Sequence, residues 1–260
     1  MFEKNIQKTS IIINKNNYLK ALSILALSIV FTILFSITPF VLDLILNNTI
    51  IPVKLNNINP LLPSTINILF LIIVSILALI CFSSISCGEK AWYSGFNKKN
   101  IIRTKRFIFW IKPNFSLKAF RLKTLKILLK LYWFGLFSVP SIVFFTTLFL
   151  LAFTGGVETY LFISILLGAL FLLILSVLFT FIISQRYFLA DYLLIENPHL
   201  GIVQVLKQSK NLMEGQIFRV VKFKLLFLPS FILCFLIFPI FFIYPHYKQS
   251  RCLLANELRL

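Results

Sequence analysis

Residues that could carry chemistry are few in this chain, and several of them gather between Gln185 and Gly215. Asp191 and His199 have side chains that can transfer protons, and Ser209 would be a nucleophile if a base lay beside it. No base is identifiable near Ser209, and His199 lies in a different loop from His246. Phosphate-loop, nucleophile-elbow and zinc-protease patterns are missing from the sequence. We therefore expect no enzyme, no metal site and no cofactor.

The composition indicates an integral membrane protein. Of 260 residues, 59% are apolar and 13% are charged, whereas soluble domains have about one half and one quarter. The net charge of +18 comes from bases between long apolar runs, a pattern that fits lipid head groups better than nucleic acid. We expect membrane lipids as partners, preferentially the anionic lipids of the inner leaflet, and no nucleic acid. Abundant Ile, Asn, Lys and Phe are typical of an AT-rich bacterium. The expected location is a cell membrane, which the protein crosses several times.

Five apolar runs predict an all-α, polytopic transmembrane helix bundle in a single domain covering residues 1–260. Each is close to the roughly 20 residues that cross a bilayer, and the first is too long for a signal peptide. The sequence T-G-G-V-E-T predicts a tight turn, so the third and fourth helices should form an antiparallel hairpin. Pro229 and Pro239 leave open whether the fifth run is a bent span or re-enters. The runs cover residues 21–46, 66–87, 129–153, 160–184 and 225–244.

The bases predict the orientation. Cytoplasmic loops carry the excess of Lys and Arg, and a cytoplasmic N-terminus places 22 of the 26 bases inside. Most lie in a basic loop at 88–128 and in an inner-face elbow at 185–224. The side of the tail after Tyr244 stays open, but this count places the remaining bases outside, namely Lys54, Lys248, Arg251 and Arg259.

Helical periodicity in the basic region predicts a helix with two unlike faces. One face is apolar and contains Leu117, Phe120, Thr124, Ile127, Leu128 and Leu131. The other side is basic and contains Lys118, Arg121, Lys126 and Lys130. Such a helix should lie in the head-group layer, with its leucines buried and its bases in contact with lipid phosphates. The acids Asp43, Glu158, Asp191 and Glu196 lie near the ends of spans or in turns, so we interpret each as a solvated interfacial residue.

The elbow has the clearest local signals. The fourth helix should continue through Y-F-L-A-D-Y-L-L-I-E and stop at Asn197–Pro198, because a residue before proline avoids the α region. A short amphipathic helix should follow and end near Gly215, which is suited to a helix C-terminus. Ser209 is interpreted as a solvated residue of this helix.

The pattern A-D-Y-x-x-x-E-N-P followed by S-K-x-L-M-x-G resembles DUF975, a bacterial membrane-protein family of unknown function. The resemblance is best over 185–250, and V-P-S-I at 139–142 corresponds to a P-G-I segment in which Ser141 replaces glycine. It implies a polytopic membrane protein, similar in plan to the membrane domain of glycerophosphoryl diester phosphodiesterases, with no catalytic residues to carry over. The matching residues, taken as a structural signature, are Ala190, Asp191, Asn197, Pro198, Ser209, Lys210, Met213 and Gly215, with Pro245 and Tyr247 beyond.

Three functions are open at this point. We favour a non-enzymatic accessory or scaffold component whose basic loop and surface helices bind the cytoplasmic leaflet. One alternative is a transporter or permease subunit for an apolar or peptide-like substrate, with prolines as hinges. The other is a membrane anchor for a lipid-phosphodiester enzyme, which depends on the resemblance alone.

Overall fold

The computed structural model describes residues 18–34, 36–37, 41, 61–99, 105–110, 112–154, 159–233 and 240–259. Within these residues all regular structure is helical, which confirms the predicted all-α class. An apolar helix at Tyr18–Leu34 comes first. The labelled elements are α2 (Leu61–Lys99), α3 (Lys105–Phe109), α4 (Pro113–Thr154), α5 (Thr159–Ser184), η2 (Gln185–Tyr187), α6 (Ala190–Glu196), α7 (Ile202–Leu212), α8 (Ile217–Leu233) and α9 (Ile240–Glu257).

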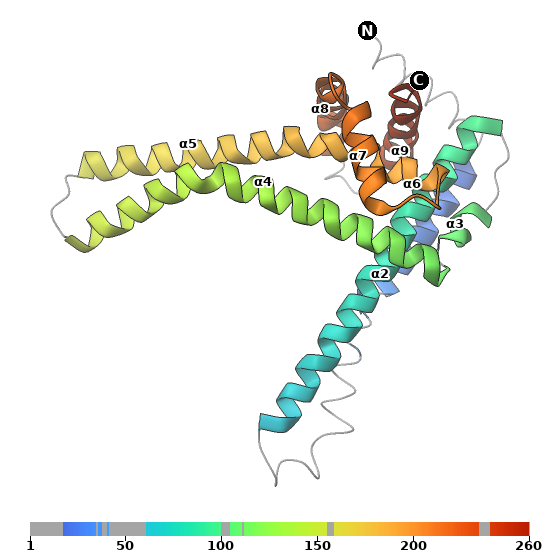
Figure 1. Cartoon of the computed structure of the whole chain (residues 1–260), viewed down its shortest axis with the longest axis horizontal. Coiled ribbons are helices and arrows are strands. Elements are labelled where there is room, and N and C mark those ends of the chain that lie inside the picture. The colour runs from blue at the N-terminus through green and yellow to red at the C-terminus, as the bar shows by residue number, and fades with distance from the viewer. Residues whose placement is uncertain are drawn as a thin grey trace.

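The long helices form two arms that diverge from a common hub (Figure 1). We define the hub as the C-terminal end of α2, residues 105–110, the N-terminal parts of α4 and α8, and η2, α6, α7 and α9. The buried hydrophobic core lies mainly in the hub, around Trp92, Trp110, Tyr192 and Phe223. The arms, by contrast, expose large apolar side chains along α2, α4 and α5. An exposed apolar surface of this extent is suited to lipid.

Within the described residues, three helices are long and apolar enough to cross a membrane: Ile72–Gly95, Pro113–Phe153 and Tyr160–Glu196. They contain most of the predicted second, third and fourth spans. The predicted first span is described only in part, as the shorter Tyr18–Leu34 helix. The predicted fifth run at 225–244 is divided between α8 and α9, and residues 234–239 lie outside the described chain. The predicted count of five spans is therefore not confirmed.

The basic stretch continues directly into the predicted third span. It forms the first part of α4, which runs for 42 residues and is therefore about 63 Å long. Because the hydrocarbon core is only about 30 Å thick, part of α4 must extend beyond it. Figure 1 shows a bend in α4, and a proline inside the helix, Pro140, is a usual cause of such a bend.

The predicted hairpin is present, because α4 packs antiparallel against α5 (Figure 1). At its centre the buried Ser141 hydroxyl donates a hydrogen bond to the Ala169 carbonyl at 3.0 Å. Small residues at both positions allow the two backbones to approach closely. This contact gives a physical reason for the small residue at Ser141.

The C-terminal tail is part of the hub. Residues after Tyr244 continue in α9, where Cys252, Leu254 and Ala255 are buried. Lys248 Nζ lies 2.7 Å from Glu89 Oε2 of α2, and Arg259 forms an ion pair with Glu196 of α6. Side chains on opposite sides of a bilayer cannot make such contacts. The assignment of these two bases and Arg251 to the outside is therefore wrong if the elbow is inside.

The start of α9 also meets the first described helix. The Tyr18 hydroxyl donates a hydrogen bond to the Phe241 carbonyl at 3.4 Å, and the Tyr18 ring stacks on Phe242 at 5.3 Å between centroids. Segments 223 residues apart in the chain are therefore in contact.

This packing predicts the side of the membrane on which the tail lies. Glu257 of α9 and Lys207 of α7 are both exposed, and Tyr160 is exposed at the far end of the α4–α5 hairpin. Cysteines introduced by Glu257→Cys and Lys207→Cys should react with a membrane-impermeant maleimide from the same side, and Tyr160→Cys from the other side. The parent protein measures the background from native cysteines. Labelling of Glu257→Cys together with Tyr160→Cys would contradict the packing of α9.

Candidate functional site

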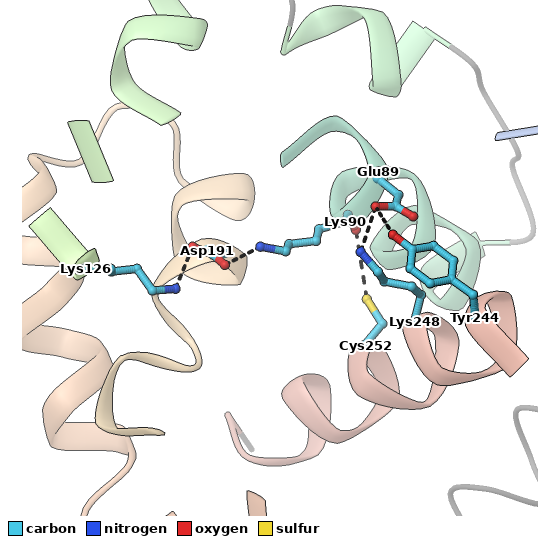
Figure 2. A network of polar contacts seen from close by, with 7 residues as sticks. All are labelled: Glu89, Lys90, Lys126, Asp191, Tyr244, Lys248 and Cys252. Atoms are coloured by element: carbon cyan, nitrogen blue, oxygen red, sulfur yellow. Dashed lines mark hydrogen bonds and ion pairs between the residues drawn. The ribbon is translucent and has the colours of Figure 1, made fainter. Parts of the chain in front are cut away.

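Three helices of the hub meet at one carboxylate, that of Asp191. Asp191 lies in the first turn of α6, where the helix dipole favours a negative charge. Lys126 Nζ of α4 lies 2.9 Å from its Oδ1, and Lys90 Nζ of α2 contacts its Oδ2 (Figure 2). The side chains are only 10% (Asp191), 17% (Lys126) and 12% (Lys90) exposed. The carboxylate therefore joins α2, α4 and α6 through charge.

The interpretation of Asp191 as a solvated interfacial residue is wrong. A buried carboxylate has to be paired because its desolvation is costly, and here each oxygen has its own lysine. The position of Asp191 also depends on an interruption of the helix. The predicted continuous helix stops at Ser184, and a 3₁₀ turn at Gln185–Tyr187 precedes α6. Gln185 and Ser184 side chains both donate hydrogen bonds to the Phe181 carbonyl, which competes with regular helical bonding.

A cavity of about 190 Å³ lies beside this carboxylate. Its polar lining comes from Ser83, Ser86 and Lys90 of α2, Lys123, Lys126 and Lys130 of α4, and Asp191. Lys123 Nζ lies 3.9 Å from the centre of the Phe82 ring, a cation–π distance. In the described part of the chain, neither Lys123 nor Lys130 forms an ion pair with a carboxylate. The cavity wall therefore carries four lysines and one acid.

A second network lies on the other side of α2. Glu89 is buried and accepts hydrogen bonds from Lys248 Nζ at 2.7 Å and from the Tyr244 hydroxyl at 3.3 Å (Figure 2). Consecutive residues of α2 thus bind different helices, since Lys90 contacts α6 and Glu89 contacts α9. Burial raises the pKa of Cys252 to about 12, so this thiol stays protonated and is a poor nucleophile.

The predicted signature residues lie in and around the elbow. Ala190 and Met213 are fully buried, and the Asn197 N–H caps α6 by donating to the Leu193 carbonyl. Gly215 has a φ of +76°, which confirms that a left-handed residue follows α7. Lys210 is exposed on α7.

The prediction that Ser209 is a solvated residue is wrong. Its side chain is fully buried, and its hydroxyl donates a hydrogen bond to the Arg186 carbonyl at 3.0 Å. The elbow is therefore held closed by a contact between α7 and the 3₁₀ turn.

The four predicted lipid-contact bases are in unlike environments. Arg121 and Lys130 are exposed, whereas Lys126 binds Asp191 and Lys118 Nζ donates to the Pro198 carbonyl at 2.8 Å. The expectation that all four extend toward lipid phosphates is thus corrected for Lys118 and Lys126. Their side chains are used inside the protein, and the opposite face of α4, including Leu128, is exposed.

The three long apolar helices, the exposed apolar arms and the charged hub define an all-helical membrane protein. Residues 49–253 match the family described as "Protein of unknown function (DUF975)", and the chain belongs to this family. The match extends well before the 185–250 region in which the resemblance is best. No curated protein and no solved structure matches the chain.

The pairing at Asp191 predicts a large loss of stability when the charge is removed. Asp191→Asn leaves two lysines largely buried without their counter-ion, which should cost about 3–5 kcal/mol of unfolding free energy. Thermal unfolding of the detergent-solubilised protein measures the effect, with Glu214→Gln at an exposed position as the control. Asp191→Leu combined with Lys90→Met and Lys126→Met should recover much of the loss, because it removes all three charges. A wild-type melting temperature for Asp191→Asn would refute the structural role.

Lys224 of α8 is a further, partly buried cation, and Lys126 and Lys130 of this site act on its charge. Its Nζ lies 2.5 Å from Gln185 Oε1 and 5.2 Å from the centre of the Phe181 ring. Burial, together with the charges of Arg251, Lys130 and Lys126, lowers the pKa of the Lys224 ammonium to about 7. The positive charges in this part of the hub thus repel one another more than nearby negative charges offset.

This pKa predicts that stability depends on pH in a defined direction. Between pH 7 and the ordinary lysine value of 10.5, the folded protein binds fewer protons at Lys224 than the unfolded chain, so the unfolding free energy rises with pH. Below pH 7 the full cost of burying the charge is present. Lys224→Met should therefore be more stable than wild type at pH 6, and this advantage should be clearly smaller at pH 9, as measured by thermal unfolding. Lys207→Met, at an exposed site, is the control, and a pH-independent difference for Lys224→Met would contradict the assignment.

Proposed function

We propose that this protein is a non-enzymatic scaffold of the bacterial cytoplasmic membrane that holds anionic lipids of the inner leaflet around its hub. The observation that supports this proposal is the separation of charge along the molecule. Residues 61–88, 131–154 and 159–184 contain no charged side chain, whereas the hub elements are rich in lysine and arginine. The uncharged arms fit the hydrocarbon, and the hub fits the head-group layer.

Exposed bases in the hub are the expected lipid contacts. Arg121 on α4 and Lys207 and Lys210 on α7 are exposed, and none of the three is in an ion pair within the described chain. Each base near an anionic surface contributes about 1 kcal/mol of attraction. The hub therefore has free positive charge at its surface in addition to the lysines that it uses internally.

The proposal includes a cytoplasmic N-terminus and hub. If α9 lies with the elbow, Lys248, Arg251 and Arg259 join the inner side, and Lys54 is the one base left for the outer side. The asymmetry between the two faces is then stronger than the sequence count alone, in the direction that the positive-inside rule favours.

The experiment compares bound lipids in wild type and in a variant with Arg121→Gln, Lys207→Gln and Lys210→Gln. Both proteins are equilibrated with mixed phosphatidylglycerol and phosphatidylcholine, and native mass spectrometry counts the retained lipids. Wild type should retain phosphatidylglycerol preferentially, and the variant should lose at least about tenfold of that preference because three attractions of about 1 kcal/mol are removed. The variant Arg121→Lys, Lys207→Arg and Lys210→Arg, which keeps the charge, should behave as wild type. Equal retention of both lipids by wild type would rule out the proposal.

A further inference from the structure

We propose that the cavity beside Asp191 is a binding site for one phosphate-bearing anion, with Lys123, Lys130 and Ser86 as its principal contacts. This inference rests on the proposed function and names the ligand of a particular site within it. Loose attraction to a leaflet needs only exposed bases, whereas a built site predicts a single, saturable ligand.

The charge of the cavity wall indicates an anion. Asp191 neutralises one of the two lysines that bind it, and both of its oxygens are already used by Lys90 and Lys126. Lys123 and Lys130 add two more positive charges to the same wall without a carboxylate of their own in the described residues. An unliganded cavity with an excess of about three positive charges is electrostatically unfavourable, and the crowding is also felt at Lys224, whose pKa is lowered partly by Lys126 and Lys130. A ligand with one or two negative charges would relieve this repulsion.

The donors suit a phosphate in particular. A lysine ammonium has three N–H donors, so Lys90 and Lys126 retain donors after binding Asp191. Ser86 contributes a hydroxyl to the lining. Asp191 therefore acts as a positioning residue that fixes two ammonium groups at the cavity wall, and Lys123 and Lys130 supply the charge that it leaves unmatched. A group with several acceptor oxygens can be bound from α2 and α4 at the same time.

The size of the cavity limits the ligand. Its volume of about 190 Å³ holds roughly six waters at the liquid share of about 30 Å³ each, and pockets for drug-sized molecules are larger, at about 300–1,000 Å³. One phosphate group with a few waters fits, and a whole nucleotide does not.

The surroundings of the cavity favour a phospholipid head group over a free ion. Lys130 is exposed, whereas Lys126 and Lys90 are largely buried, so the lysines extend from the surface inward. Ile127 lines the same cavity and is 48% exposed, and Leu131 farther along α4 is also exposed. Acyl chains attached to a bound phosphate would thus find an apolar helix surface next to the site.

The experiment uses the full-length protein, delipidated in neutral detergent and titrated separately with phosphatidylglycerol, phosphatidylcholine and inorganic phosphate. Native mass spectrometry gives the stoichiometry, and thermal unfolding gives the stabilisation by each ligand. Wild type should bind one phosphatidylglycerol saturably. The variant Lys123→Gln with Lys130→Gln, which keeps Asp191 and its two lysines, should weaken this binding at least about tenfold because two charge-assisted contacts are lost. The variant Lys123→Arg with Lys130→Arg should retain binding and so control for misfolding.

The outcomes separate the two sources of phosphate and the two proposals. Binding of inorganic phosphate that competes with the lipid supports the site with a free anion as an alternative ligand, and binding of phosphatidylglycerol without such competition supports a lipid ligand. The variant Arg121→Gln, Lys207→Gln and Lys210→Gln should lose the loosely held anionic lipids and keep the single tight one. If neither ligand binds at a 1:1 ratio, or if Lys123→Gln with Lys130→Gln binds as wild type, the site is refuted even when wild type still enriches anionic lipid at the exposed bases.

Discussion

The arrangement of the hub depends on the burial of one carboxylate. Asp191 is removed from water in a short helix, and a charge in that position is stable only if cations reach it from both sides. Those cations are on α2 and α4, so the ion pairs fix how the two long helices cross the elbow. Glu89, which precedes Lys90 in α2, is also a buried carboxylate paired with a lysine. Its partner is Lys248, so this ion pair joins α9 to the other face of α2. Charge rather than apolar packing alone therefore determines how these helices are joined.

The arms and the hub are stabilised in different ways. Between the described parts of α4 and α5, the Ser141 hydroxyl donates a hydrogen bond to the Ala169 carbonyl, and the Phe137 and Phe179 rings lie 5.6 Å apart between centroids. Close packing at small residues with an interhelical hydrogen bond is typical of helices that meet in lipid. In the hub, aromatic rings, ion pairs and side-chain bonds to backbone carbonyls close a conventional core. The molecule thus combines a membrane-type hairpin with a core like that of a soluble domain.

Local features of this fold can be predicted from the sequence, and its long-range partners cannot. Hydropathy locates the long helices, Asn197–Pro198 locates the end of α6, and Gly215 marks the turn between α7 and α8. The burial of Asp191 gives no local signal, because Lys90 and Lys126 are 101 and 65 residues away along the chain. Periodicity finds two faces on α4 but does not tell which of them contacts protein, so Lys126 is assigned to lipid when it in fact binds Asp191. The sequence of α9 mixes polar and apolar residues, so it does not predict that this helix packs in the hub and forms ion pairs with α2 and α6.

Because α9 packs against α2, a contact of the hub has to wait for a segment that is synthesised much later. Glu89 is separated from Lys248 by 159 residues, so at about 5–20 residues per second the ribosome needs roughly 8–30 s to deliver the lysine that neutralises it. The interval is longer for Tyr18, because its partner Phe241 in α9 is synthesised 223 residues after it. During this interval the nascent chain has an unpaired acid at the end of α2, and a chain truncated before α9 would retain that defect permanently. The Glu89 side of the hub can therefore reach its folded arrangement only after α9 has been synthesised.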